Sequence, residues 1–232
     1  MSTLIVFAKI PQTGKVKTRL GKDIGLDKAT ELYRCFLLDA VEQYSHLMSI
    51  RVVFYFSPEE HQPEELHLIP EQFKIKFQRG NDLGERMLNA IKDEIHHGPC
   101  MIVGSDHPNL PTQYIKDGLE YLNAYPNSIV IGKSEDGGYY TIGMNKVYPQ
   151  IFQNMVYSNE NVYTETVTRI TENNINSFDL PTWYDIDSLD DVRKLVADLS
   201  NPLFGSYQPN HTLRFLRHDK KLIELLGEEL DD

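Results

Sequence analysis

An apolar run that stops abruptly in a polar loop constrains the fold of this chain more than any other feature. Residues 100–110 have the sequence CMIVGSDHPNL, so the apolar run ends at Gly104 and is followed by Asp106 and Pro108. A short apolar run bounded by Gly and Pro is typical of a buried strand that ends in a loop. Asp106 is therefore expected at the carboxyl end of a central strand, where open α/β sheets bind their ligands.

The carboxylate of Asp106 has two interpretations at this stage. A carboxylate at such a position is a hard oxygen ligand, suited to the Mg2+ or Mn2+ that accompanies the phosphates of a nucleotide. The alternative is that Asp106 only caps a turn ahead of Pro108. The other motifs of the chain decide between these two interpretations.

Composition and charge bound the class of protein. The 232 residues suffice for one large domain, and 41% hydrophobic with 25% charged residues is an ordinary soluble composition. A net charge of −11 disfavours a nucleic-acid-binding surface, which needs a basic face. No apolar run reaches the length of a membrane span, so neither nucleic acid nor membrane is an expected partner.

The cellular location is predicted from the N-terminus and the cysteines. The first residues, MSTLIVFAKIPQ, contain an apolar stretch without a preceding basic region or a small-residue cleavage site, which favours a first strand over a signal peptide. Cys35 and Cys100 lie in apolar segments and form no C-x-x-C pattern. Buried free thiols and a cytoplasmic protein are therefore expected.

Apolar periodicity predicts alternating strands and helices. Strands are expected at 3–8, 50–56, 73–77, 100–104, 128–132 and 177–180, and helices at 27–44, 83–91, 112–124, 159–174 and 189–199. Asp27 is expected to cap the first of these helices. This alternation predicts an α/β fold with a mostly parallel sheet and helices on both faces. Residues 1–200 are expected to form one domain and residues 201–232 a C-terminal helical tail.

The loop after the first strand concentrates positive charge in an acidic chain. Lys15, Lys17 and Arg19 lie between Gly14 and Gly21. Glycine lets backbone N–H groups approach phosphate oxygens, and the cations supply charge. The spacing is not that of a Walker A loop. A solvated basic loop is the alternative, but this loop leaves its strand on the side where Asp106 leaves its own, which favours a phosphate site.

Three further segments each allow a structural and a functional interpretation. Residues 78–86 form a glycine-containing loop into a helix, where Asp82 can cap the helix or the loop can receive a base or phosphate. Residues 136–138, Asp-Gly-Gly, can be a tight turn between strands or can close on a ligand. Ser188 and Asp191 resemble a capping box, and the neighbouring carboxylates at 185, 187 and 190 exceed what capping requires, so at least one is expected to face a cation.

Taken in order, these motifs resemble those of a known family. The ordered set covers roughly residues 3–200 and comprises Phe7-Ala-Lys-Ile-Pro11, Gly14-Lys-Val-Lys-Thr-Arg-Leu20, the segment from Gln78 to Met87, Gly104-Ser-Asp106-x-Pro108-x-Leu110, Asp136-Gly-Gly-Tyr-Tyr140 and Asp185-x-Asp187 ahead of Asp191. The chain resembles the bacterial glycosyltransferase-like family associated with arsenosugar biosynthesis, long carried as a domain of unknown function. That family belongs to the nucleotide-diphospho-sugar transferase superfamily, so the resemblance implies a GT-A, Rossmann-like fold.

The resemblance also implies roles for individual residues. The nucleotide is expected to be bound by Lys15, Lys17, Thr18, Arg19, Gln78, Gly80, Asp82 and Gly84. The metal ligands are expected to be Asp106 and Asp187, and the acceptor pocket is expected to be formed by Gly137, Gly138 and Tyr139. Asp106, Lys17 and Asp136 are the candidate catalytic residues, the last to orient or deprotonate the acceptor hydroxyl. His107 and Lys133 depart from the residues usual in the family.

Three functions follow from this pattern, in order of preference. The first is a metal-dependent transferase that uses a nucleotide-sugar donor and a small-molecule acceptor. The second is a nucleotidyltransferase that joins an NTP to a phosphorylated acceptor, since the Lys17–Leu20 segment is also similar to 2-phospholactate guanylyltransferase. The third is a nucleotide-binding protein without turnover. The sequence leaves the sugar, the base, the acceptor and a homo-oligomeric state open.

Overall fold

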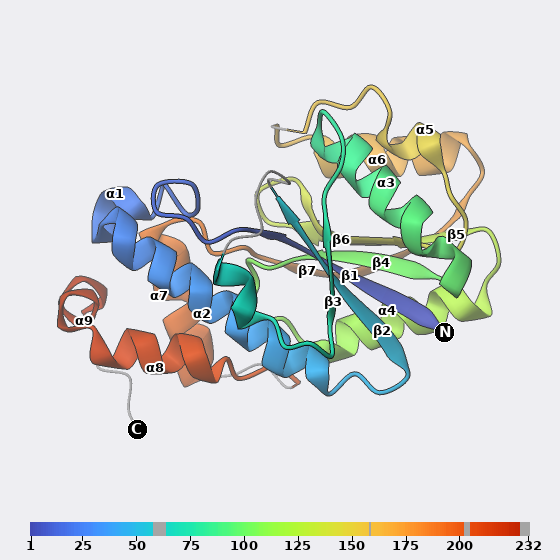
Figure 1. The fold of residues 1–232 in the computed structure, drawn as a ribbon. Helices are drawn as coiled ribbons and strands as arrows, with labels where there is room; N and C mark the ends of the chain where they lie inside the picture. Colours follow the sequence, from blue (N-terminus) through green and yellow to red (C-terminus); the bar gives the residue numbers. More distant parts are fainter. Residues whose placement is uncertain (58–63, 158, 202–204, 228–232) are drawn as a thin grey trace.

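The structure is a computed structural model that describes residues 1–57, 64–157, 159–201 and 205–227 (Figure 1). Its strands are β1 (Ser2–Lys9), β2 (Ile50–Ser57), β3 (Lys74–Phe77), β4 (Cys100–Gly104), β5 (Ser128–Ser134), β6 (Tyr139–Met144) and β7 (Asn176–Trp183). Its α-helices are α1 (Gly21–Ile24), α2 (Leu26–Ser45), α3 (Leu83–Glu94), α4 (Thr112–Ala124), α5 (Pro149–Phe152), α6 (Val162–Glu172), α7 (Leu189–Ser200), α8 (Asn210–His218) and α9 (Lys220–Leu226). Short 3-10 helices occupy Glu64–Leu68 and Ile95–His97.

The seven strands form one mixed sheet in the order β3-β2-β1-β4-β6-β5-β7. Strand β1 lies in parallel between β2 and β4, with Ile5 opposite Val53 on one side and Ile102 on the other. Strand β6 runs antiparallel to both of its neighbours, β4 and β5. The expected α/β fold with a mostly parallel sheet is therefore confirmed, whereas the antiparallel strand β6 and the short helices α1 and α5 were not predicted.

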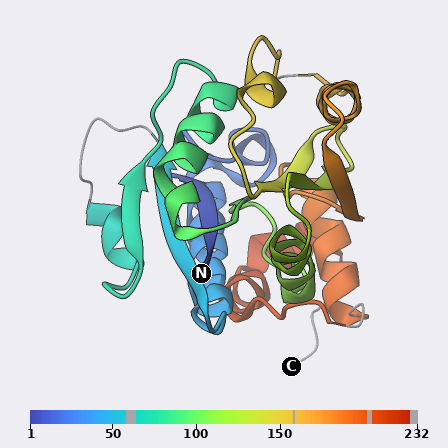
Figure 2. The same cartoon turned by 90° about the vertical axis from the view of Figure 1, so that its right-hand side faces the viewer.

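Helices cover both faces of the sheet (Figures 1 and 2). One face packs against α2, α4 and α7, with α8 outside α2, and the other packs against α3, α5 and α6. Strand β1 serves both layers, since Leu4 and Val6 belong to one hydrophobic cluster and Ile5 to the other. Burial on both faces explains why this strand is an unbroken apolar run.

The helix starts show which local predictions hold. Asp82 caps α3 by accepting a 2.7 Å hydrogen bond from the Glu85 backbone N–H, and the capping box of Ser188 and Asp191 begins α7. The predicted cap of α2 is wrong. The helix begins after Gly25, whose φ of 99° turns the chain out of α1, so Asp27 lies inside the first turn and accepts a hydrogen bond from the Thr13 hydroxyl instead.

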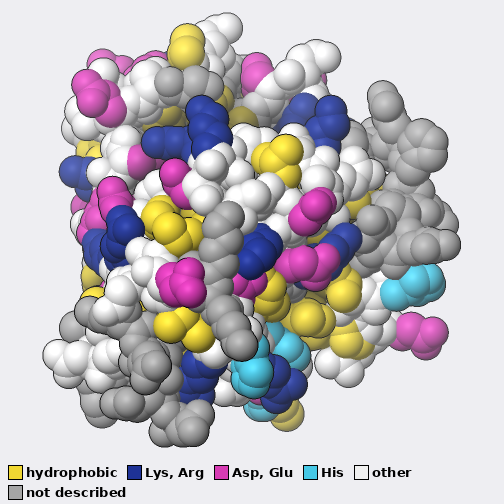
Figure 3. All heavy atoms as spheres, turned by 90° about the vertical axis from the view of Figure 1, so that its left-hand side faces the viewer, with side chains coloured by type: hydrophobic (Ala, Val, Ile, Leu, Met, Phe, Trp, Pro, Cys, Tyr) yellow, Lys and Arg dark blue, Asp and Glu magenta, His cyan; other side chains and the backbone are white. Residues whose placement is uncertain are grey.

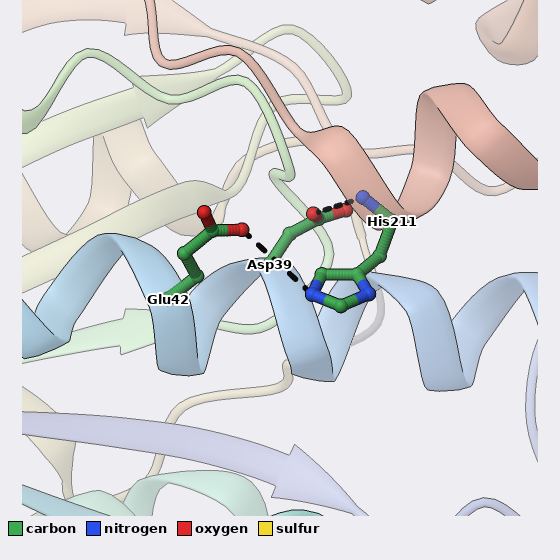
Figure 4. Close-up of side chains that lie close together, drawn as sticks. All are labelled: Asp39, Glu42 and His211. Carbon is green, nitrogen blue, oxygen red and sulfur yellow. Dashed lines mark hydrogen bonds and ion pairs between the residues drawn. The ribbon is translucent and has the colours of Figure 1, made fainter.

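The described part of the C-terminal tail docks on α2 through a buried carboxylate (Figure 4). Asp39 is fully buried and accepts hydrogen bonds from the backbone N–H groups of His211 and Thr212, at 2.8 and 2.9 Å, and from the Thr212 hydroxyl at 2.5 Å. These donors lie in the first turn of α8, so Asp39 satisfies the helix start. The described part of the tail contains α8 and α9, while residues 202–204 and 228–232 lie outside the described residues.

No helix in the described part of the chain combines the length and the apolar character needed to span a bilayer.

Candidate active site

The carboxyl ends of β1 and β4 bring the basic loop and Asp106 together. The loop between β1 and α1 carries Lys17 to within 2.9 Å of the Asp106 carboxylate, just beyond the end of β4. The same ammonium lies 2.8 Å from the carboxylate of Asp187, which precedes α7. Three segments far apart in the sequence therefore meet at one edge of the sheet. On the face toward which this loop points, Lys and Arg side chains are interspersed with Asp and Glu, and hydrophobic side chains show between them (Figure 3).

The charges of Lys17, Asp106 and Asp187 strongly affect one another. The side chain of Lys17 is only 4% exposed, whereas those of Asp106 and Asp187 are 38% and 42% exposed. Burial alone would lower the pKa of the Lys17 ammonium, but the two carboxylates outweigh it and raise the pKa above its ordinary value. Burial likewise would raise the pKa of Asp187, yet the adjacent Lys17 brings that pKa below its ordinary value. Lys17 therefore stays cationic between two anions.

Neighbouring groups hold Lys17 in this orientation. Its backbone adopts a φ of 45°, a left-handed conformation that is uncommon for a residue with a side chain. Its ammonium lies 5.9 Å from the ring centres of both Tyr33 and Phe36, within range of a cation–π interaction. The Tyr33 hydroxyl accepts a hydrogen bond from the Lys9 backbone N–H and hydrogen-bonds the Ser105 hydroxyl, at 2.8 and 2.9 Å. This links the ends of β1 and β4 around the cluster.

A cavity of about 520 Å³ opens beside the cluster. Five of the predicted site residues line it, namely Arg19, Asp106, Asp136, Gly138 and Tyr139. The walls also include apolar side chains from the end of β1 and the start of α3, represented by Phe7, Leu83 and Met87. The cavity is therefore polar toward the acidic residues and apolar toward α3.

The loop between β3 and α3 contributes structure more than cavity surface. Gln78 is buried, and its amide donates to the backbone carbonyls of Ala8 and Tyr55, at 3.1 and 2.9 Å. Asp82 is the helix cap already described. A Cβ on Gly84 would lie 2.5 Å from the ring of Tyr157, so this glycine allows a close approach. Gln78, Asp82 and Gly84 do not line the cavity, and a role for them in binding the nucleotide remains a prediction.

Gly80 is also needed for the local backbone conformation. It adopts a φ of 146°, and a Cβ there would lie 2.8 Å from the Arg86 backbone nitrogen. The exposed loop residues Lys15 and Thr18 lie near the cluster in sequence, and within the described chain their side chains make neither an ion pair nor a hydrogen bond. They are therefore available to a ligand approaching from solvent.

The turn between β5 and β6 is tightly packed. The carboxylate of Asp136 accepts a 2.9 Å hydrogen bond from the Gly138 backbone N–H, which closes the predicted turn. Gly137 adopts a φ of 93°, and a Cβ there would lie 2.1 Å from the Glu160 carbonyl oxygen. The turn therefore needs glycine at this position, and one oxygen of Asp136 is committed to the turn while the side chain borders the cavity.

His107 and Asp185 line the cavity, and neither was given a site role from the sequence. His107 is buried, and its Nδ1 donates a 3.0 Å hydrogen bond to the Tyr184 carbonyl oxygen. Asp185 accepts a 2.5 Å hydrogen bond from the Ser134 hydroxyl. Burial raises the pKa of Asp185, against the opposing effects of His107 and Ser134. The excess of carboxylates before α7 was the available signal for Asp185, and the departure from the family pattern was the signal for His107.

The Asp106 and Asp187 pair fits a hard divalent cation. Two carboxylate oxygens already converge on one cation, the Lys17 ammonium, and oxygen donors suit Mg2+ or Mn2+. Among the described residues, one group of three potential ligands lies within 4.8 Å of one another, formed by Asp39, Glu42 and His211 (Figure 4). Because Asp39 is occupied by the start of α8, that group is explained by the docking of the tail.

The fold is that of nucleotide-utilising transferases. A crystal structure of a protein from Desulfovibrio desulfuricans G20, provisionally named a nucleotide-diphospho-sugar transferase, matches 99% of both chains with a TM-score of 0.86 and 30% sequence identity. The chain belongs to the bacterial family described as "Uncharacterized protein conserved in bacteria" (DUF2064), which matches residues 40–159. No protein of curated function matches the chain in sequence.

More distant structures share the fold alone. A cytidylyltransferase from Leptospira borgpetersenii matches 100% of this chain and 99% of its own, with a TM-score of 0.57 and 14% identity. The inositol-1-phosphate CTP transferase of T. maritima matches 93% of this chain and 96% of its own, with a TM-score of 0.54 and 12% identity. The likeness therefore extends to the architecture of enzymes that use CTP.

Proposed function

We propose that the protein is a cytoplasmic, metal-dependent glycosyltransferase-like enzyme that uses a nucleotide-sugar donor and a small acceptor. The observation that carries this proposal is the buried Lys17 held between Asp187 and Asp106, the second of which lines the cavity. Such a cluster lies where parallel sheets bind ligands, and the 30%-identical relative carries the corresponding provisional name. The association with arsenosugar biosynthesis implied by the resemblance stays a prediction.

The residues of the basic loop would act on the diphosphate of the donor. Lys17 and the exposed Arg19 are fixed cations at the carboxyl edge of the sheet, and charge placed where the leaving group develops negative charge stabilises the transition state. Lys15 and Thr18 would add contacts from solvent. Asp106 and Asp187 would hold Mg2+ or Mn2+, which when bound would neutralise further charge on the diphosphate. Asp136 would orient the acceptor hydroxyl with its free carboxylate oxygen.

A thermal-shift panel tests the proposal. UDP-, GDP-, ADP- and dTDP-sugars are compared with free NTPs, with and without Mn2+. A ligand at about 100 times its Kd adds about 2.7 kcal/mol to the free energy of unfolding, which is roughly 5–10 °C in Tm for a chain of this size. We expect one nucleotide sugar to give a Mn2+-dependent shift of this order.

Two variants make the panel specific. Asp106→Asn should abolish the Mn2+-dependent shift, because it removes one of the two charged oxygen donors. Asp23→Asn is the matched control, since Asp23 is an exposed aspartate on the neighbouring α1 and should leave the shift unchanged. An unaltered shift in Asp106→Asn would contradict the metal assignment, and the absence of any nucleotide-dependent shift in the wild type would contradict the proposed function.

Nucleotidyl transfer is the second candidate, favoured by the architecture shared with the two CTP-using enzymes. The same cationic loop would then bind an NTP, and a phosphate acceptor would attack the α-phosphate with loss of pyrophosphate. A shift by a free NTP alone, followed by pyrophosphate release, would select this reaction. Binding without any product, retained in Asp106→Asn, would instead indicate a nucleotide-binding protein without turnover.

A further inference from the structure

One end of the cavity is rich in carboxylate side chains, which accept hydrogen bonds. We define this acidic end by His107, Ser134, Asp136, Glu160 and Asp185, all of which line the cavity. Three of these side chains are carboxylates, which accept hydrogen bonds when ionised. The Ser134 hydroxyl already donates its proton to Asp185, so toward the cavity it can only accept. A ligand that satisfies this surface must supply donors.

The charge of the acidic end opposes anions. Arg19 is the single Lys or Arg among the described residues that line the whole cavity. The nearby Lys17 is already shared between Asp106 and Asp187. A phosphate or carboxylate placed among three carboxylates would meet like charge, and such juxtaposition is strongly unfavourable. The acidic end therefore selects against anionic groups.

His107 supplies an independent sign that a ligand is expected there. Its side chain is more than nine-tenths buried, with 7% exposure, yet it lines the cavity. Nδ1 donates to the Tyr184 carbonyl oxygen, so Nε2 is the ring nitrogen that is left for a ligand. Among the described residues, none donates a hydrogen bond to Nε2, which points toward the cavity-lining Gly104. A ring nitrogen without a protein partner, in a side chain that is largely buried, costs free energy unless a ligand or water hydrogen-bonds it.

Aromatic rings form the adjoining wall. Tyr139, Tyr140 and Tyr157 line the same cavity, and the ring of Tyr140 packs edge-on against His107 with centroids 5.7 Å apart. Rings beside hydrogen-bond acceptors suit a molecule with C–H faces and hydroxyl edges, because the faces pack on the rings while the hydroxyls donate. A polyhydroxyl compound has both features.

We propose that the acidic end binds an uncharged, hydroxyl-rich group and excludes phosphorylated or carboxylated ones. The group is either the glycosyl moiety of the donor or a polyol acceptor. This inference rests on the proposed function insofar as the nucleotide occupies the other end of the cavity. It separates the two candidate reactions, because nucleotidyl transfer to a phosphorylated acceptor would place an anion among three carboxylates.

Saturation-transfer NMR with free D-glucose and D-glucuronate tests the proposal without a nucleotide. The two probes share a ring and differ by one carboxylate. We expect millimolar binding of glucose and at least roughly tenfold weaker binding of glucuronate, from like-charge repulsion at short range. Equal or stronger binding of glucuronate, or no binding of glucose, would overturn the proposal. The nucleotide panel is a separate measurement, so failure of the proposed function is recognised independently.

Variants tie the selectivity to the acidic end. The double variant Asp136→Asn/Glu160→Gln removes two exposed charges while keeping their shapes, and it should bring glucuronate binding to within about threefold of glucose. Glu120→Gln, on the exposed side of α4, is the matched control and should keep the wild-type ratio. His107→Phe should weaken glucose binding; if that variant does not fold, the double variant still decides. An unchanged ratio in the double variant would overturn the assignment.

The nucleotide sugar that shifts Tm distinguishes the two sources of the group. If the donor's glycosyl moiety occupies the acidic end, this nucleotide sugar abolishes the glucose signal, whereas the matching nucleoside diphosphate leaves it. If a polyol acceptor occupies the acidic end, glucose still binds in the presence of the nucleotide sugar. Either result supports the proposal, and loss of the glucose signal with the nucleoside diphosphate alone would contradict it, because the nucleotide itself would then fill the acidic end.

Discussion

Replacing Lys17 by Met removes the buried ammonium while keeping an unbranched side chain of similar length. At 2.8 and 2.9 Å from two carboxylate oxygens, each charge pair attracts by about 6 kcal/mol at an effective dielectric constant of roughly 20. Desolvation of a side chain that is 4% exposed cancels most of this attraction. Losing one partner of a fully buried pair costs about 3–5 kcal/mol, and the partial exposure of both carboxylates reduces this to about 2 kcal/mol.

The pH dependence of the loss identifies its electrostatic origin. Because Lys17 holds the pKa of Asp187 below its ordinary value, this carboxylate stabilises the folded state above the unfolded pKa near 4, and the stabilisation is lost as pH falls through the folded pKa. The raised pKa of Lys17 acts at the other limit, since its contribution is lost only as pH rises through the folded pKa, above about 10.4. The difference between wild type and Lys17→Met should therefore be constant at neutral pH and shrink in acid.

Urea denaturation of wild type and Lys17→Met across this pH range measures the effect. Lys15→Met is the matched control, because Lys15 is an exposed cation of the same loop, and surface substitutions of this kind change stability by less than about 0.5 kcal/mol. We expect a clear loss for Lys17→Met alone. Equal stability of the two variants at neutral pH, or a loss that persists unchanged in acid, would refute the argument that an ion-pair cluster anchors the loop.

Further predictions concern the packing, the tail and the thiols. Gly137→Ala should lower the free energy of unfolding by more than about 2 kcal/mol, because its Cβ would clash with the backbone. Gly25→Ala has space for the Cβ and should lose only about 1 kcal/mol, from its positive φ. Thermal unfolding of the two variants measures this difference. Burial raises the pKa of Asp39 to about 6, so its contribution to stability is present at low pH and declines as pH rises through 6, and Asp39→Asn should flatten this decline in urea midpoints. Burial also raises the pKa of Cys100 to about 12, so a thiol reagent should modify it only after unfolding.

The position of the site could be predicted from strand ends, whereas the choice of residues within it depended on backbone geometry. The apolar run ending at Gly104 was enough to place Asp106 at the carboxyl edge of a central strand. Which lysine of the loop turns inward could not be predicted, because that choice follows from the left-handed conformation of Lys17 and from rings contributed by α2. Sequence spacing carries no information on either.

Residues with two interpretations were resolved by contacts distant in sequence. Asp82 is a helix cap, as its place before an apolar helix allowed, and Gln78 holds two backbone carbonyls through pairings that only the sheet order determines. His107 gave little signal because its partner, the Tyr184 carbonyl, lies 77 positions away. Strand β6 was not assigned because a short segment after a tight turn has the same local pattern whichever neighbour it pairs with.

The cluster around Lys17 can form only late in the synthesis of the chain. The lysine and Asp187 are separated by 170 positions, so the growing chain has to extend beyond β7 before the ammonium gains its second carboxylate. Until then, β1 can pair with β2 and β4, but the basic loop has only one of its two anchors, Asp106. A nascent or truncated chain would thus acquire most of the sheet before it acquires the site, and the ability to bind a nucleotide would report that the chain is complete through the start of α7.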